Sequence, residues 1–233
     1  MNVSEVIELL EANQNERGIQ KWNEIYPDPE SLKSFGIGLT ALRKLAKKIG
    51  RDHDLARELW KSNIYDVKIM ALLIDEPKKI TREQAEIQVE QLHGGYLAHV
   101  FSSCDAALAK TDFTVELAAD WVHSDSTIRK SCGYGLVYEL SKSKKKSAPD
   151  DAFFMQLIDH IRENFHQEHI SVQGSMGGAL MGMGKRSAAL NAYALELARE
   201  LGPIHFETTG DYCEPLNVVK HLTSDYIKEK FGL

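Results

Sequence analysis

The segment from Leu55 to Asp75 constrains the fold of this chain more than any other stretch. Its first part carries apolar residues on one side of a short helix, and its second part does so again after a polar turn at residues 62–63. The apolar positions are Leu55, Leu59 and Trp60, then Val67, Met70, Ala71 and Ile74. Neither helix is long enough to be stable alone in water. The segment therefore predicts a helical pair that stacks on neighbours.

The same two-helix unit recurs twice along the chain. Aligning Val67 with Ile128 and Val172 gives intervals of 61 and 44 residues, and residues 81–110 can supply an extra helical pair in the first interval. Imperfect two-helix repeats of roughly 40–47 residues are typical of HEAT-like α-solenoids. The alternative is an irregular helical bundle whose helices share amphipathic spacing. We predict an all-α, HEAT-like helical repeat solenoid that forms a single domain over residues 1–233, with roughly ten to twelve helices.

Composition limits the classes of protein that remain. Hydrophobic residues make up 43% of the 233 residues and charged residues 27%, as in ordinary globular proteins. No apolar run reaches the length of a membrane span, no signal peptide is evident, and three scattered cysteines suit a reducing compartment, so we expect a cytoplasmic protein. The net charge of −6 argues against a generic nucleic-acid coat but allows a local basic groove.

Several helix boundaries can be predicted from local signals. We expect a first helix over residues 3–14 with Ser4 as its N-cap, a helix that ends at Gly50, one from Thr81 to about residue 92, and one from about residue 96 to 110. The segment 141–149 is polar, cationic and closed by proline, which predicts an exposed loop. The helix before Gly50 carries several cations opposite its apolar side, and solubility is their simplest explanation. These cations are Arg43, Lys44, Lys47, Lys48 and Arg51.

Five glycines fall within residues 174–184, which otherwise read as helix. Each glycine inside a helix costs about 1 kcal/mol relative to alanine. We expect either close packing of another element or the approach of a ligand to offset that cost, and we favour close packing. The segment does not match a P-loop, because Arg186 follows Gly184 and Lys185 where serine or threonine is required.

Metal and cofactor chemistry find little support in the chain. His166 and His169 are spaced three residues apart, but nothing else that could complete a metal site clusters there. No nucleophile elbow and no zinc-protease motif occur. We expect no cofactor and no metal, and the residue patterns alone predict a binding scaffold.

The strings LARELWKSNIYDVKIMALLIDEP and ISVQGSMGGALMGMGKRSAALN, with the repeat around Trp121 between them, resemble the AlkD-like DNA alkylation repair family. The resemblance covers roughly residues 36–201. It implies HEAT-like repeats with a cationic groove for duplex DNA, alkylated or not. Active members excise cationic alkylated purines with a Trp-x-x-x-Asp pair on one helix, an arginine on a later helix and a further tryptophan.

This chain departs from that pattern in either of two alignments. An ungapped alignment anchored on Lys110 and Trp121 places Gly95 at the tryptophan, His99 at the aspartate and Ser131 at the arginine. We prefer it, because the alternative needs a compensating deletion. Neither the neutral nor the protonated form of a histidine stabilises a developing cationic sugar as a carboxylate does. We therefore expect negligible excision of 7-methylguanine.

The shifted alignment places Phe101 and Asp105 at the first two positions and Lys130 at the third, and both alignments place Gly178 at the late aromatic. The catalytic candidates are therefore Asp105 and His99. We expect duplex DNA to contact cations near the second helices of the repeats, and a charge reversal of Arg129 with Lys130 to weaken that contact. The predicted DNA-binding residues are Lys68, Arg129, Lys130, Lys185 and Arg186. A non-catalytic scaffold that binds a protein partner is the alternative function.

Overall fold

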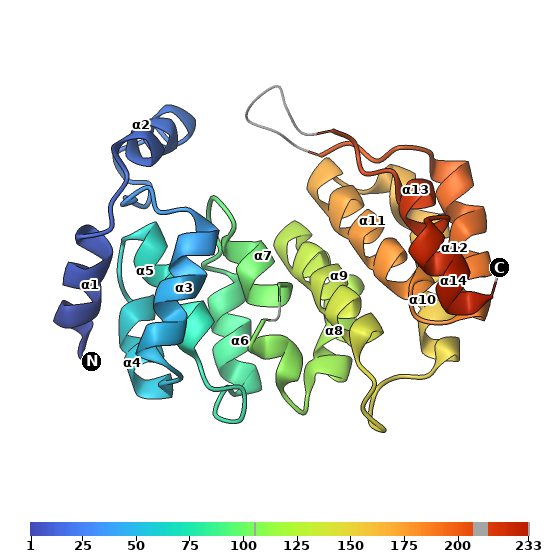
Figure 1. The fold of residues 1–233 in the computed structure, drawn as a ribbon, viewed down its shortest axis with the longest axis horizontal. Coiled ribbons are helices and arrows are strands. Elements are labelled where there is room, and N and C mark those ends of the chain that lie inside the picture. Colours follow the sequence, from blue (N-terminus) through green and yellow to red (C-terminus); the bar gives the residue numbers. More distant parts are fainter. Residues whose placement is uncertain (105, 207–213, 233) are drawn as a thin grey trace. The chain divides into compact units, whose positions relative to one another are not determined.

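The computed structural model describes residues 1–104, 106–206 and 214–232, and every regular element within them is a helix (Figure 1). The elements are α1 (Val3–Glu11), α2 (Glu16–Ile25), α3 (Leu39–Ile49), α4 (His53–Trp60), α5 (Tyr65–Ile74), α6 (Arg82–Val89), α7 (Leu97–Ser102), η1 (Leu108–Lys110), α8 (Thr114–Val122), α9 (Thr127–Lys142), α10 (Asp151–Asn164), η2 (Phe165–Gln167), α11 (Ile170–Gly184), α12 (Ala188–Leu201), α13 (Val218–Leu222) and α14 (Asp225–Phe231). Strand-like pairing in these residues is limited to two isolated bridges, Lys33 with Ile64 and Ile204 with Leu216. The all-α prediction is confirmed, with more and shorter helices than expected.

The described residues form two compact units, Met1–Asp112 and Phe113–Leu233. In the first unit, α5 is the central helix and packs against α1, α3, α4 and α7. Nine of its ten residues are buried, including Asp66 and Lys68. Neighbours therefore cover α5 on several sides, whereas its sequence predicted a single apolar stripe. The proposed single domain over the whole chain stays a prediction.

The second unit is organised around α9 and α11, which lie side by side (Figure 1). Gly182 permits this contact, and Gly177 permits the close approach of Ile204. A Cβ atom on Gly182 would lie 2.6 Å from the Ser141 hydroxyl oxygen and 2.7 Å from the Tyr138 ring, and one on Gly177 would lie 2.5 Å from Ile204. Close packing, the favoured explanation of the glycine cluster, is confirmed at these positions.

Two predicted helix boundaries are wrong. The first helix is capped by Asn2, whose side chain accepts from the Glu5 amide while the Glu5 carboxylate accepts from the Asn2 amide, so Ser4 lies inside the first turn. The helix expected over residues 96–110 is broken. Its first part ends at Ser102, and Cys104 adopts a φ of 56°, a left-handed conformation that a continuous α-helix excludes.

Candidate nucleic-acid interface

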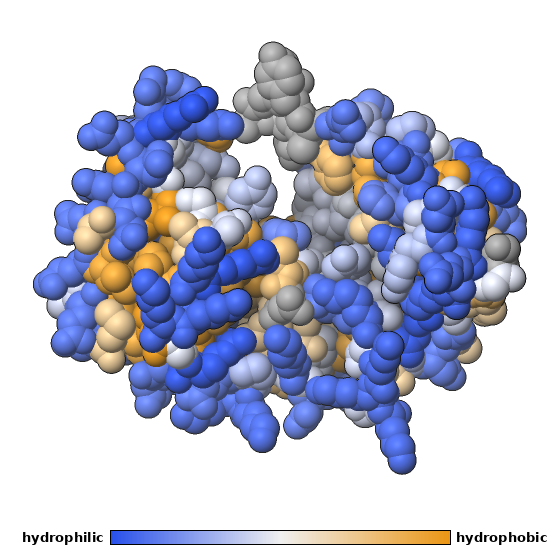
Figure 2. Space-filling view, in the orientation of Figure 1, coloured by the Kyte–Doolittle hydropathy of each residue, from blue (hydrophilic) through white to orange (hydrophobic). Residues whose placement is uncertain are grey.

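Helix α3 presents two different faces. Leu42, Leu45 and Ala46 are buried on the side that packs against α5. The other side carries Arg43, Lys44, Lys47 and Lys48. Within the described residues, none of these four cations forms an ion pair with a carboxylate. Figure 2 shows hydrophilic side chains gathered over α3.

A groove of about 410 Å³ lies beside this cationic face, between α3, α5 and α7 in the first unit. Its floor is apolar, and its rim carries Arg43, Lys47, Arg51 and Lys110. We call it the α3 groove. Arg51 is held in place by a 2.5 Å hydrogen bond that its Nη1 donates to the Asp75 carbonyl oxygen. Four cations around one groove form a surface suited to phosphate oxygens.

Part of this cationic surface could be predicted from the sequence. The cations of α3 were visible as one side of a helix, but their simplest explanation was solubility. Lys110 could not be linked to them, because it lies some sixty residues further along the chain and joins the groove only through η1.

The catalytic candidate His99 lies at the edge of the α3 groove. It is exposed on α7, and its Nε2 lies 2.6 Å from the Sγ of Cys104, which lines the groove. The other catalytic candidate, Asp105, lies outside the described residues. The Cys104 thiol is therefore the contact between His99 and the lining of the α3 groove.

In the ungapped alignment the equivalents of the Trp-x-x-x-Asp pair do not lie on one helix. Gly95 lies in a turn before α7 with a φ of 53°, and a Cβ atom there would lie 2.6 Å from the Tyr65 ring. In the shifted alignment Phe101 is buried, and α7 ends at Ser102. A Cβ atom on Gly178, at the late aromatic position, would lie more than 4 Å from every described neighbour outside its own helix.

Lys68 is placed away from the α3 groove. Its Nζ donates a 2.6 Å hydrogen bond to the carbonyl oxygen of Trp60 and lies 4.3 Å from the centroid of the Trp60 ring. Burial lowers the pKa of this ammonium group. Lys68 lines a second groove, which is described below.

The two predicted cations of α9 have partners within the second unit. Lys130 forms a 2.5 Å ion pair with Glu168, and both side chains are largely buried. The guanidinium carbon of Arg129 lies 5.9 Å from the centroid of the Trp121 ring. Both residues belong to the first turn of α9.

Arg186 binds the opposite end of α9. Its guanidinium donates to the carbonyl oxygens of Ser141, Ser143 and Pro149 at 2.8–3.1 Å and thereby holds the loop between α9 and α10. The twelve residues from Arg129 to Ser141 span about 18 Å of helix. Lys185 is half-buried, and burial lowers its pKa. The structure therefore does not bring the four predicted cations of this unit into one stripe.

The histidines near α11 have structural partners. His169 is the N-cap of α11, and its Nδ1 accepts from the Ser171 amide at 3.3 Å. His160 contacts the His123 ring, and its pKa is lowered by burial and then by His123. No three histidine, cysteine or acidic residues cluster as metal ligands in the part of the chain that the structure describes.

Comparison with known proteins identifies the class. A model of the DNA alkylation repair enzyme family matches residues 6–204, and the chain belongs to that family. Uncharacterized proteins of Listeria monocytogenes and Listeria innocua are each 24% identical over 196 residues, which cover 83% of this chain and 84% of theirs.

A solved structure shares the fold. It comes from a new family of proteins related to the HEAT-like repeat DNA glycosylases, with affinity for branched DNA structures. The two chains align with a TM-score of 0.81 and 21% identity, over 100% of this chain and 97% of the other. The predicted HEAT-like repeat fold is confirmed. Among the described residues, no helix is long and apolar enough to cross a membrane.

Proposed function

We propose that this protein binds DNA through the phosphate backbone and that the α3 groove is its main contact surface. The observation that carries the proposal is the set of four cations on α3 that form no ion pair within the described chain. Phosphate contacts release counterions and supply most of the affinity of non-specific DNA binding. Membership of the DNA alkylation repair enzyme family supports DNA as the partner.

We further propose that the protein does not excise 7-methylguanine. The preferred alignment has His99 at the carboxylate position, and a histidine supplies no negative charge to a developing cationic sugar. Gly95 supports this proposal, because its φ of 53° and its approach to Tyr65 leave no room for an aromatic side chain. Excision well above background would overturn it. Asp105→Asn and His99→Ala would then show which alignment is correct.

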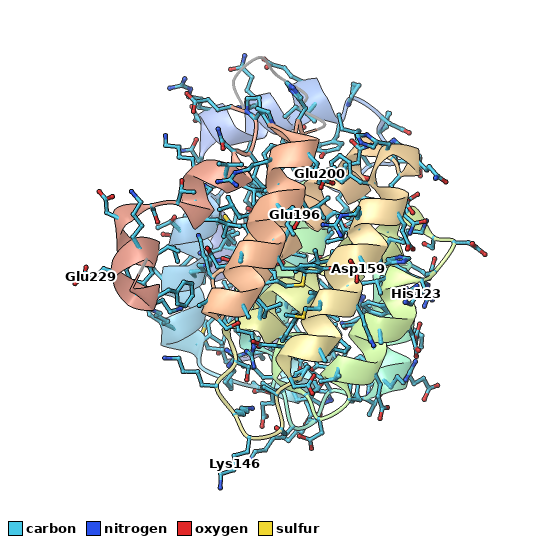
Figure 3. All side chains as sticks on the ribbon, turned by 90° about the vertical axis from the view of Figure 1, so that its right-hand side faces the viewer. His123, Lys146, Asp159, Glu196, Glu200 and Glu229 are labelled. Carbon is cyan, nitrogen blue, oxygen red and sulfur yellow. The ribbon has the colours of Figure 1, made fainter. Side chains whose placement is uncertain are left out.

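The binding surface can be tested with two variants of equal net charge. One reverses Arg43, Lys47 and Lys110 to glutamate at the rim of the groove. The other reverses Lys144, Lys145 and Lys146, which are exposed in the loop between α9 and α10, from which Lys146 projects (Figure 3). We expect fluorescence anisotropy at low salt to show at least a tenfold loss of duplex affinity for the groove variant and less than threefold for the loop variant.

Equal losses in the two variants would show that net charge alone governs binding. A third variant, Arg129→Glu with Lys130→Glu, tests the sequence-based site in the second unit. No measurable binding of the unmodified protein at low salt would favour the protein-binding scaffold instead.

The relative with affinity for branched DNA suggests a preferred form of the ligand. We propose that a four-way junction binds more tightly than a duplex of equal length. Competition between the two labelled DNAs measures the preference directly, and equal affinity would contradict it.

A further inference from the structure

A second groove in the first unit lies between α4 and α6 and shares no lining residue with the α3 groove. Its volume of about 700 Å³ falls within the range of small-molecule sites. Leu32, Trp60 and Ile87 supply apolar walls. We call it the α4–α6 groove.

Lys68 is the unusual group in this groove. The residue is only 9% exposed, yet it carries an ammonium with three N–H donors. Within the described chain its only hydrogen-bond acceptor is the Trp60 carbonyl oxygen, at 2.6 Å. A buried charge with so few partners is unfavourable unless an anion or a polar ligand completes its environment.

Two glutamine amides also line this groove. The indole N–H of Trp60 donates to the Gln91 Oε1 at 2.6 Å, which fixes that amide and leaves its nitrogen for another partner. The Gln88 residue is buried, and its amide nitrogen has no hydrogen-bond partner among the described residues. The groove therefore holds two amide nitrogens without described acceptors in addition to the Lys68 ammonium group.

The charged groups of the lining are mostly cationic. Among the described lining residues, Arg57, Lys61 and Lys68 stand against one carboxylate, Glu83, and Lys61 already pairs with the Glu58 carboxylate at 2.6 Å. The Nδ1 of His53, which also lines the groove, lies 2.7 Å from the Asp75 carboxylate, which fixes the ring and leaves Nε2 without a described partner. The lining favours an anionic ligand.

We infer that the α4–α6 groove binds a small organic anion, with a carboxylate or phosphate group on Lys68 and the amides of Gln88 and Gln91, and an apolar body against Trp60 and Ile87. This site is separate from the proposed DNA surface. A bound anion would add to the Trp60 carbonyl and the Trp60 ring as a partner of the buried Lys68 ammonium group.

The test uses phenyl phosphate and benzoate as matched anionic probes and benzyl alcohol as their neutral control. The indole N–H resonance of Trp60 reports on the site by ¹H–¹⁵N NMR, and Trp60→Phe assigns it among the three tryptophans of the chain. We expect at least one anion to shift this resonance and to raise the melting temperature, and the alcohol to do neither. The stronger of the two anions identifies the charged group that the groove prefers.

Lys68→Met should abolish the response to the anions, whereas Lys47→Met, which removes an exposed cation of α3, should preserve it. If Lys68→Met does not fold, Gln88→Met provides the same test and should weaken binding at least fivefold.

The inference is overturned if neither anion shifts the resonance, or if the anions bind the Lys68→Met or Gln88→Met protein as tightly as the unmodified one. It is also overturned if Lys68→Met lowers duplex affinity as strongly as the α3 groove variant, because Lys68 would then serve DNA. If the α3 groove variant loses DNA binding and Lys68→Met keeps it, the result agrees with the inference.

Discussion

The main cationic helix of the first unit differs from the cations near α9, α10 and α11 of the second unit in how many protein partners it has. In the first unit the buried organising charge is an acid. The Asp66 carboxylate is fully buried and accepts from the Ser34 hydroxyl and from the amides of Phe35 and Ile37 at 2.7–3.0 Å. The cations of α3 remain on the surface without carboxylate partners among the described residues.

In the second unit several cations serve the fold instead. Arg186 binds three carbonyl oxygens, Lys130 binds Glu168, and Arg162 lies within 3.2–3.6 Å of carboxylate oxygens on Asp159, Glu196 and Glu200. Figure 3 shows these three acids on one face of α10 and α12. The difference indicates that the number of cations in a segment says little about how many of them are available to phosphate. A cation that already binds a carboxylate or a carbonyl oxygen of the protein is less available.

The largest effect should come from the acid that organises the first unit. Asp66→Ala leaves two backbone amides and a hydroxyl without their acceptor, and we expect the free energy of unfolding to fall by about 3 kcal/mol. Chemical denaturation measures the loss. The exposed Asp54→Ala on α4 is the control and should change stability by less than about 0.5 kcal/mol. Similar losses in both variants would contradict the role assigned to Asp66.

The helix contact that organises the second unit can be tested with two glycines of α11. Gly182→Val inserts a side chain against Ser141 and Tyr138, and we expect a loss of about 2–3 kcal/mol. Gly178→Ala enters open space and should stabilise by about 0.5–1 kcal/mol, because alanine favours the helix. Thermal denaturation distinguishes the opposite signs. A loss at both positions would mean that α11 is crowded on all sides.

Arg186 was predicted from the sequence as a DNA-binding residue, and one variant can distinguish a role in folding from a role in DNA binding. Arg186→Met removes the donors to three carbonyl oxygens, and we expect a loss of about 2 kcal/mol in stability. Duplex affinity measured on the folded variant should stay within threefold of the unmodified protein. A tenfold loss of affinity without destabilisation would assign Arg186 to the DNA surface.

The smallest effect concerns pH and the second unit. Burial lowers the pKa of His160, so the unfolded chain binds this proton more readily than the folded one. Stability should therefore fall as pH drops below about 6.5, the ordinary value for histidine, and level off below the lowered pKa. The loss should stay under about 1 kcal/mol, because His160 is only partly buried and its interactions are screened by solvent. Melting temperatures from pH 8 to 5 should show a shallower decline for His160→Gln.

Local periodicity was enough to predict most helices. The stripes around Trp60 and Val67 became α4 and α5, and the helix predicted to end at Gly50 ends there with a glycine φ of 85°. The break after α7 was missed, because residues 96–110 keep helical spacing of apolar residues. Cys104 adopts a left-handed conformation, which residues other than glycine rarely adopt, so apolar spacing could not predict it.

The site was less predictable than the fold. Sequence spacing identifies which residues are cationic, but not which of them have partners. Glu168, which pairs with Lys130, is 38 residues away, and the carbonyl oxygens that bind Arg186 are 37–45 residues away. Such contacts arise only when helices pack. The α3 cations could be placed on one helix face, but the groove they share with Lys110 required the folded chain.

The salt dependence of duplex binding tests the central claim most directly. Each phosphate contact contributes about −0.9 to the slope of log affinity against log salt concentration for duplex DNA. Replacing Arg43, Lys47 and Lys110 with glutamine should therefore make the slope less steep by roughly 2–3, whereas the same replacement at Lys144, Lys145 and Lys146 should leave it nearly unchanged. An unchanged slope for the groove variant would contradict the account, because the α3 groove would then make no phosphate contact.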